Sequence, residues 1–431
     1  MVNKMSEEEI FDAIVIGAGP AGTACAYKLA QKGKSVLLID RSSNAGGKNL
    51  MGGRLYTYAL DIVDPELRME AKFERKVARE QIMVLGKDTG ITIDFENFAV
   101  KDQALAEQSY TILRAGFDEW FAGKAEEIGV MLATGIKVDD LLIKDDKVIG
   151  VIAGDDKMYA NTIVAADGIN SFMAQKAGLR DDLKPTMVGV GVKEVISLPA
   201  KIIQERFQVG ENEGAARMVI GGTDGLTGGG FLYTNKESIS LGMVFSPEKL
   251  NQSRRSIQEI YQDFKMNSAI QKLIGDGESL EYGAHLVPEG GWLHSVPKKL
   301  YRNGFLIVGD AAGFCINTGT ILRGMDLALL SGVAAANAIL SEKEIGLVYM
   351  EELQRLNLIQ TMKLYKGWPD IIGLERMATV YPQLINEITK FMFTVDGKVP
   401  KKMPKAMMHI TRKYVTLKNL VQDAWKGGRS I

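Results

Sequence analysis

Apolar runs and a helix-forming stretch alternate at the start of the chain. Phe11–Ile16 is a short apolar run, Thr23–Gln31 has a helix-forming composition, and Ser35–Ile39 is a second apolar run. Short apolar runs that end at Gly or a charged residue are typical of buried strands. The pattern therefore predicts a strand–helix–strand unit.

The period of the apolar positions changes several times further along. Strand-like alternation predicts hairpins, and helical spacing predicts helices. We expect a hairpin over 81–95, a helix over 103–129, two short strands within 138–152, a β-rich region over 183–289 with a glycine-rich turn at 221–230 and a hairpin over 231–245, and helices after residue 326.

A glycine motif, Gly17-Ala-Gly19-Pro-Ala-Gly22, joins the first strand to the first helix. Gly17 allows the tight turn, Gly19 lets a pyrophosphate approach the backbone, and Gly22 lets the helix pack closely on the strand. The phosphates then lie at the helix N-terminus. Asp40 ends the second strand, where a carboxylate can accept hydrogen bonds from an adenosine ribose. The alternative is a glycine-rich turn that binds nothing, but the flanking strands and the acid favour a dinucleotide site.

Two later segments, 162–171 and 304–321, each contain a short apolar run that ends in an acid and small residues. With the N-terminal motif they resemble the glutathione-reductase-like flavoprotein superfamily, in its aromatic-hydroxylase-like branch. The resemblance implies FAD, with Gly309 and Asp310 at a ribityl hydroxyl. It also implies a turn and helix start at Gly319, Thr320 and Ile321 that present N–H groups to the pyrimidine edge of the flavin ring. Gly309-Asp310 taken alone is equally typical of a type I turn.

Composition excludes several other classes. The chain has 52 Lys and Arg residues against 53 Asp and Glu, so no binding to nucleic acid is implied. Two cysteines supply neither a disulfide framework nor an iron–sulfur cluster, and three scattered histidines have no metal-ligand spacing. No run of about 18 apolar residues and no apolar signal segment is present. We therefore expect a cytoplasmic protein.

The order of these segments predicts an α/β fold, in which a doubly wound, Rossmann-like FAD domain is interleaved with an antiparallel β-sheet domain. We assign 1–72, 104–182 and 290–345 to the FAD domain, 73–103 and 183–289 to a substrate or acceptor domain, and 346–431 to a helical C-terminal region. Only one dinucleotide motif is found, so no separate NAD(P) domain is expected.

Three further runs, 44–56, 285–291 and 313–328, narrow the resemblance. They are similar to FixC-type flavoproteins, which are relatives of electron-transfer-flavoprotein:quinone oxidoreductase and, more distantly, of geranylgeranyl reductases. This resemblance implies electron transfer from an electron-transfer flavoprotein towards a quinone. Because the cysteines of an iron–sulfur domain are absent, it also implies a separate, small ferredoxin-like partner. Residues 340–431 carry no motif that we recognise.

The same resemblance implies a set of FAD contacts. The pyrophosphate is expected at the glycine turn, the adenosine at the end of the second strand, and the ribityl chain and ring at later loops. The residues are Gly17, Gly19, Ala21 and Gly22 with Arg114 for the pyrophosphate, Asp40, Arg41 and the backbone of Val138 for the adenosine, and Lys48 and Arg54 for the ribityl chain and ring. Solvated loop charges are the alternative for Arg41 and Lys48, a surface helix position for Arg114, and a core strand position for Val138.

The flavin supplies the redox chemistry, so no catalytic side chain is assigned. We expect His285 to be a strand residue with satisfied hydrogen bonds, and Cys315 to be a small buried residue.

The C-terminal stretch from Lys398 to Arg429 has nine Lys or Arg residues and one acid, Asp423. Such a stretch suits an acidic ferredoxin-like partner or peripheral contact with an anionic membrane face, and a solvated tail is the alternative.

Three functions remain open on the sequence. The first is electron transfer to quinone. The second is a stand-alone NAD(P)H-dependent flavin hydroxylase or an isoprenoid (geranylgeranyl) reductase. The third is a flavin-containing scaffold without catalysis.

Overall fold

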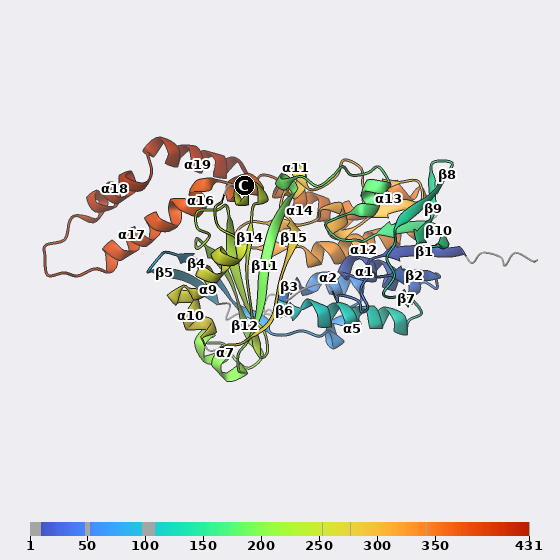
Figure 1. Cartoon of the computed structure of the whole chain (residues 1–431), viewed down its shortest axis with the longest axis horizontal. Coiled ribbons are helices and arrows are strands. Elements are labelled where there is room, and N and C mark those ends of the chain that lie inside the picture. The colour runs from blue at the N-terminus through green and yellow to red at the C-terminus, as the bar shows by residue number, and fades with distance from the viewer. Residues whose placement is uncertain are drawn as a thin grey trace, which may run out of the picture.

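Two sheets lie one after the other along the long axis of the molecule (Figure 1). The computed structural model describes residues 10–47, 52–96, 108–251, 253–275, 277–341 and 343–430. In this part of the chain the first sheet has eight strands and the second has nine. The interleaved α/β architecture predicted from the sequence is confirmed.

The eight-stranded sheet contains the predicted strand–helix–strand unit. Its main path runs β16-β17-β10-β1-β2-β7, and β17, β10, β1, β2 and β7 are parallel to one another. The strands are β1 (Ile10–Ile16), β2 (Val36–Ile39), β7 (Met131–Ala133), β8 (Asp140–Lys144), β9 (Lys147–Ala153), β10 (Asp156–Ala165), β16 (Tyr301–Arg302) and β17 (Phe305–Ile307).

Helices α1 (Pro20–Ala30) and α12 (Met325–Ile339) pack closely against each other beside this sheet. Small residues make the approach possible, since a Cβ on Gly332 would lie 2.1 Å from the backbone oxygen of Ala21. Almost every side chain of α12 is buried. The helix therefore forms part of the core and holds the first turn of α1 in place.

The nine-stranded sheet runs β15-β11-β14-β13-β12-β4-β6-β3, with β5 paired to β4. Neighbouring strands are antiparallel except β12 and β4. The strands are β3 (Gly52–Tyr56), β4 (Lys76–Leu85), β5 (Gly90–Glu96), β6 (Ser109–Leu113), β11 (Val188–Ser197), β12 (Glu213–Ile220), β13 (Gly228–Thr234), β14 (Ser238–Phe245) and β15 (Ser279–Pro288).

One face of the nine-stranded sheet carries its own apolar core. Side chains such as Val192, Ile196 and Leu241 pack there with Phe207 and Phe264 from the covering helices. These helices are α7 (Ala200–Phe207), α9 (Ile257–Met266) and α10 (Ser268–Ile274), which cover the outer side of the sheet in Figure 1. The opposite face is thereby left for the boundary with the eight-stranded sheet.

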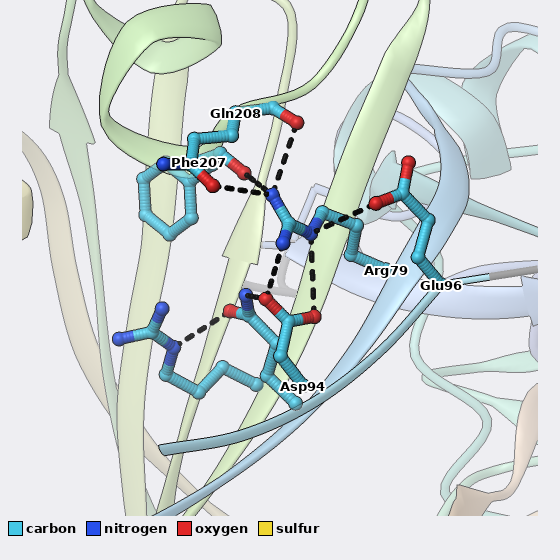
Figure 2. A network of polar contacts seen from close by, with 7 residues as sticks. Arg79, Asp94, Glu96, Phe207 and Gln208 are labelled. Carbon is cyan, nitrogen blue, oxygen red and sulfur yellow. Dashed lines mark hydrogen bonds and ion pairs between the residues drawn. The ribbon is translucent and has the colours of Figure 1, made fainter. Parts of the chain in front are cut away.

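A polar network ties the β4–β5 hairpin to α7 (Figure 2). The Arg79 guanidinium donates to the carboxylate of Asp94 at 3.2 and 2.5 Å and to the carbonyls of Phe207 and Gln208 at 3.0 and 3.1 Å. Gln208 adopts a left-handed conformation that ends α7. A cation at this position satisfies carbonyls that a helix C-terminus leaves free.

From α12 onwards the elements are helices. The last three, α17 (Tyr381–Phe393), α18 (Met403–Tyr414) and α19 (Leu417–Ser430), form an arm beyond the nine-stranded sheet (Figure 1). No helix in the described residues is long and apolar enough to cross a membrane. The others are α2 (Thr57–Val63), α3 (Pro65–Glu70), α5 (Arg114–Glu127), α6 (Phe172–Lys176), α8 (Pro247–Leu250), α11 (Gly291–His294), α13 (Ile345–Arg355), α14 (Leu358–Leu364), α15 (Trp368–Ile372) and α16 (Glu375–Thr379).

The two predicted hairpins are confirmed as β4–β5 and β13–β14, and the two short strands predicted within 138–152 are β8 and β9. The helix predicted over 103–129 is wrong at its start, because residues 109–113 form β6 and α5 begins only at Arg114; residues 97–107 lie outside the described part. The expected domain limits also shift. β3 and β6 fall in segments that we assigned to the FAD domain, but they pair within the nine-stranded sheet.

Candidate functional site

The turn from β1 into α1 forms a cradle made of backbone. Gly17 has φ +105°, and a Cβ there would lie 2.3 Å from the carbonyl oxygen of Ala166. A Cβ on Gly22 would lie 2.0 Å from the carbonyl oxygen of Gly17, whereas a Cβ on Gly19 would meet nothing within 4 Å. Gly17 and Gly22 are thus required because a side chain would clash with the backbone. Gly19 borders open space where a ligand can approach.

The first turn of α1 also leaves polar groups free for a ligand. The Oγ1 atom of Thr23 is buried and has no hydrogen-bond partner. The helix starts at Pro20 without a side-chain cap, so its N–H groups point to the same open space. An uncapped helix N-terminus with space in front of it suits a pyrophosphate. The residues therefore fit the dinucleotide part of FAD, and contact of Ala21 with it stays a prediction.

Asp40 closes the cradle at the end of β2. Its Oδ2 accepts a hydrogen bond from the N–H of Ala18 at 2.9 Å, and its Oδ1 accepts one from the N–H of Ser42 at 2.8 Å. Each carboxylate oxygen keeps a further acceptor site that can serve a ribose. Arg41 is exposed and Val138 is buried in the core, so their expected adenosine contacts stay predictions.

A second turn lies across from the cradle, where β17 leads into Gly309–Ala312. The N–H of Gly309 donates to the Ser331 hydroxyl on α12 at 2.9 Å. Arg180 donates to the carbonyl of Ala311 at 2.7 Å and to that of Ser295 at 3.1 Å. These contacts fix the turn and the position of Asp310 within it.

Asp310 is the acidic centre of a group of cations. Burial raises the pKa of its carboxyl, and the charges of Arg114, Lys193 and Arg180 oppose this shift. Charges carried by α5, by β11 and by the segment after α6 therefore all act on this one carboxyl. This is the position at which the sequence predicts the ribityl chain of FAD.

Arg114 begins α5 and is already paired. Its guanidinium donates to the carboxylate of Asp118 at 3.1 and 2.8 Å, and Asp118 is almost fully buried. A Cβ on Gly53 would lie 3.9 Å from the Arg114 side chain. The residue therefore lies at the boundary of the two sheets, beside Asp310. Its expected contact with the pyrophosphate is not tested and stays a prediction.

Arg54 lies on β3 of the nine-stranded sheet, not in a loop. Its guanidinium forms a bidentate ion pair with Glu80, donates to the Ser109 hydroxyl at 3.0 Å, and lies 4.7 Å from the centre of the Tyr56 ring. The loop assignment is therefore wrong, because pairing with β6 extends this segment. Lys48 lies outside the described residues.

The turn predicted at 319–321 is present, but the helix start predicted there is wrong. These residues form the tip of a hairpin between β18 (Ile316–Asn317) and β19 (Leu322–Arg323), and α12 begins at Met325. The N–H groups of Gly319 and Ile321 donate within the turn, to Asn317 Oδ1 at 2.8 Å and Thr318 Oγ1 at 3.0 Å. Thr320 is exposed. The free helix N-terminus on this side is therefore that of α12.

A cavity of about 520 Å³ adjoins this hairpin. It is lined by aromatic and apolar side chains and by polar ones that include Asp61, Arg68 and Arg323. The Arg323 guanidinium donates to the Tyr58 hydroxyl at 2.8 Å. A volume of this order suits a small organic molecule. Among the described residues no group of three or more His, Cys, Asp or Glu side chains is placed to hold a metal ion.

Sequence reasoning missed two residues on the inner face of the nine-stranded sheet. Lys193 on β11 and His285 on β15 face Arg114 and the Asp310 turn. The expectation that His285 has satisfied hydrogen bonds is wrong, since its Nδ1 is buried without a partner. One local signal was available: Lys193 is the only charged residue in Val188–Lys193, a run in which Val and Gly alternate before it.

Comparison with family models gives two matches. The C-terminal domain of the ETF-QO/FixC family matches residues 370–431, a segment in which we recognised no motif, and the pyridine nucleotide-disulphide oxidoreductase model matches residues 11–158.

Full-length relatives show the same similarity. The chain is 41% identical over 428 residues to Protein FixC of Escherichia coli (97% of this chain, 99% of that protein). It is 41% identical over 437 residues to the probable electron transfer flavoprotein-quinone oxidoreductase YdiS of Escherichia coli (99% of this chain, 100% of that protein).

Among solved structures, a geranylgeranyl bacteriochlorophyll reductase-like protein from Thermoplasma acidophilum is similar in fold. The TM-score is 0.70 at 17% identity, and the match covers 96% of this chain and 100% of that one.

Proposed function

We propose, because this chain belongs to the ETF-QO/FixC family of FAD-dependent oxidoreductases, that it takes electrons from an electron-transfer flavoprotein and passes them towards a quinone. The observation that carries the proposal is the 41% identity, over nearly the full length of both chains, to a probable electron transfer flavoprotein-quinone oxidoreductase. The single dinucleotide cradle in the described residues supports it.

FAD supplies the two-electron chemistry when it is bound, and the chain supplies position and charge. The Gly17–Gly22 turn would hold the pyrophosphate, and Asp40 would hold the adenosine ribose. Asp310 would hold the ribityl chain. The N-terminus of α12 would stabilise negative charge on the pyrimidine edge of the ring.

A separate ferredoxin-like protein is part of the proposal. The only cysteines of the chain, Cys25 and Cys315, are both buried and lie in different elements. An iron–sulfur cluster needs four thiolates or their equivalent. These two residues do not supply such a ligand set, so we assign the cluster to the ferredoxin-like partner.

The C-terminal arm supplies a surface for peripheral contact with an anionic membrane face, on the cytoplasmic side. Leu417, Val421 and Trp425 are spaced at one helical repeat on α19 and are 50%, 64% and 64% exposed. Asp423, the one acid of the tail, is held by the Arg376 guanidinium at 2.6 Å, so it does not offset the basic residues. Exposed apolar side chains among basic residues are typical of interfacial helices.

The identity of the electron donor that reduces the flavin distinguishes the proposed function from its alternatives. We expect anaerobic, FAD-loaded protein to be reduced rapidly by a reduced electron-transfer flavoprotein and slowly by NADH or NADPH, as followed at the flavin absorbance bands. Rapid reduction by a nicotinamide alone would replace the proposal with a stand-alone hydroxylase or isoprenoid reductase.

Membrane contact is tested by vesicle flotation. Val421→Asp should abolish binding to vesicles that contain anionic lipid while FAD content stays unchanged. The matched control is Leu364→Asp on α14, the same change from an exposed apolar residue to an acid outside the arm. Equal flotation of wild type and Val421→Asp would remove the membrane part of the proposal and leave the electron-transfer part in place.

A further inference from the structure

Two polar side chains lie side by side on the inner face of the nine-stranded sheet. Lys193 on β11 is paired with Gly242 on β14 and with Gly283 on β15, and His285 on β15 is paired with Gly191 on β11. Paired residues in a sheet project to the same face. Glycine neighbours add no side chains, so the face is recessed beside His285 at Gly191, whereas the Phe231 ring fills the space over Gly242.

The recessed face points towards the predicted flavin site. The charge of Lys193 acts on the Asp310 carboxyl, and the charges of Lys193 and Arg114 both act on His285. The opposite face of the same strands is filled by the apolar core under α7, α9 and α10. Lys193 and His285 therefore border the space between the sheet and the Asp310 turn.

Neither side chain has a partner that accounts for its position. Among the described residues Lys193 forms no ion pair, and its ammonium group lies 5.8 Å from the centre of the Phe231 ring. The Nδ1 atom of His285 is buried and makes no hydrogen bond. Half-buried charges and buried ring nitrogens are normally paired, so both groups are available to a ligand that enters this space.

The surroundings define the chemistry of that ligand. Burial lowers the pKa of Lys193 to about 8, so the ammonium form still dominates at pH 7. Burial lowers the pKa of His285 to about 3, so its ring is neutral and one nitrogen can donate. Phe231 and Val244 supply an apolar wall. A planar, apolar molecule with an oxygen that accepts hydrogen bonds fits these groups.

We propose that Lys193 and His285 bind the carbonyl oxygen of the quinone, at the point where negative charge develops as the quinone is reduced. This inference rests on the proposed function, because it identifies the acceptor pocket of the same site. Lys193 supplies the positive charge, and His285 supplies a directed hydrogen bond. Both act as binding residues, and the electrons come from the reduced cofactor.

Binding of a hydroxynaphthoquinone anion tests the proposal without turnover. The probe is 2-hydroxy-1,4-naphthoquinone, titrated into oxidised FAD-loaded protein and measured by equilibrium dialysis. We expect Lys193→Met to weaken its binding at least about tenfold and His285→Phe to weaken it about threefold or more, from the loss of one charged and one neutral hydrogen bond. Lys193→Arg should restore most of the affinity.

Two controls separate binding from folding and from cofactor effects. Lys201→Met removes an exposed lysine on α7, across the sheet, and should leave the affinity unchanged. FAD content and the flavin reduction potential should stay at the wild-type values in Lys193→Met. Unchanged affinity of the naphthoquinone for Lys193→Met would overturn the inference. If the flavin reduction potential shifts at the same time, Lys193 acts on the flavin and not on the quinone.

Failure of the inference and failure of the proposed function give different results. If the naphthoquinone binds in a Lys193-dependent way but a reduced electron-transfer flavoprotein does not reduce the protein, the quinone pocket is supported and the proposed electron donor is contradicted. Normal electron transfer to quinone with Lys193-independent binding would support the proposed function and contradict the pocket.

Discussion

The eight-stranded and nine-stranded sheets contribute different kinds of groups to the boundary between them. The first sheet presents backbone: the turn at Gly17–Gly22 owes its shape to glycines, and Gly19 leaves open space in front of a helix N-terminus. The second sheet presents side chains: Lys193 and His285 lie among glycines on a face that also carries apolar residues and the Arg54–Glu80 ion pair. A dinucleotide can thus be bound by a motif that is local in the sequence. Binding of the quinone depends on residues that only the tertiary structure brings together.

The two sheets also differ in how they are held together. Small residues let α1 and α12 approach each other beside the first sheet. The second sheet is tied by arginines that donate to backbone carbonyls, with Arg75 fully buried and Arg79 partly exposed. Substitutions at Gly19 test the backbone site beside the first sheet, and substitutions at Arg75 and Arg79 test the side-chain contacts that hold the second sheet.

The largest effect is expected at Gly19. Its φ of −81° suits any residue, and a Cβ there meets nothing in the protein, so Gly19→Val should leave the apo-protein as stable as wild type. The same side chain fills the space in front of α1. The purified variant should therefore contain almost no FAD, measured as the ratio of flavin to protein absorbance. An FAD content equal to wild type would show that the pyrophosphate does not pass Gly19.

Arg75→Met should strongly destabilise the nine-stranded sheet. The Arg75 side chain is 1% exposed and donates to the carbonyls of Asn235, Glu211 and Lys236 at 2.6, 2.8 and 2.9 Å. Its removal leaves several buried carbonyls without donors, which costs about 3 kcal/mol or more. Urea unfolding of the apo-protein measures this loss. A loss below about 1 kcal/mol would contradict the role given to Arg75.

The stability of the apo-protein should depend on pH through Asp167, at the end of β10. Burial raises the pKa of this carboxyl from 3.8 to about 6, although the N–H of Met173 donates to it at 2.9 Å. Between about pH 4 and pH 6 the folded state holds a proton that the unfolded chain has released, so stability falls as pH rises through this window. Because the side chain is partly exposed, we expect a loss of about 1–2 kcal/mol. Asp167→Asn should flatten the dependence of the unfolding free energy on pH in this window. An unchanged slope would mean that other titrating groups cause the pH dependence.

Arg79→Met should have the smallest effect, about 1 kcal/mol. Its ion pair with Asp94 is partly exposed, with side-chain exposures of 13% and 29%, and partly exposed pairs contribute little. Comparison with Arg75→Met under the same urea conditions isolates the effect of burial. Equal losses for the two variants would mean that the network in Figure 2 supports the sheet as strongly as the buried arginine does.

Local patterns predicted much of the fold. Alternation and turn residues were sufficient for the hairpins around Lys144–Lys147 and over 231–245, and the glycine motif was sufficient for the cradle. Prediction failed where distant pairing decides the structure. Residues 109–113 are extended because they pair with β3, more than 50 residues earlier in the chain, although their apolar spacing suits a helix.

The candidate site divides in the same way. Gly17, Gly19 and Gly22 follow one another in sequence, so their geometry could be predicted. Lys193 and His285 come together only through the register of β11 with β15, which no local pattern determines. Arg54 was placed in a loop for the same reason, because its ion pair with Glu80 depends on the order of strands in the sheet.

Single-turnover reoxidation tests most directly whether the boundary between the sheets is a quinone-reducing site. The FAD-loaded protein is reduced anaerobically and mixed with a short-chain quinone analogue or with oxygen, and the return of flavin absorbance is followed. We predict that the quinone reoxidises the protein faster than oxygen does at equal concentration, and that Lys193→Met slows only the reaction with quinone. Faster reoxidation by oxygen, with no dependence on Lys193, would contradict the account.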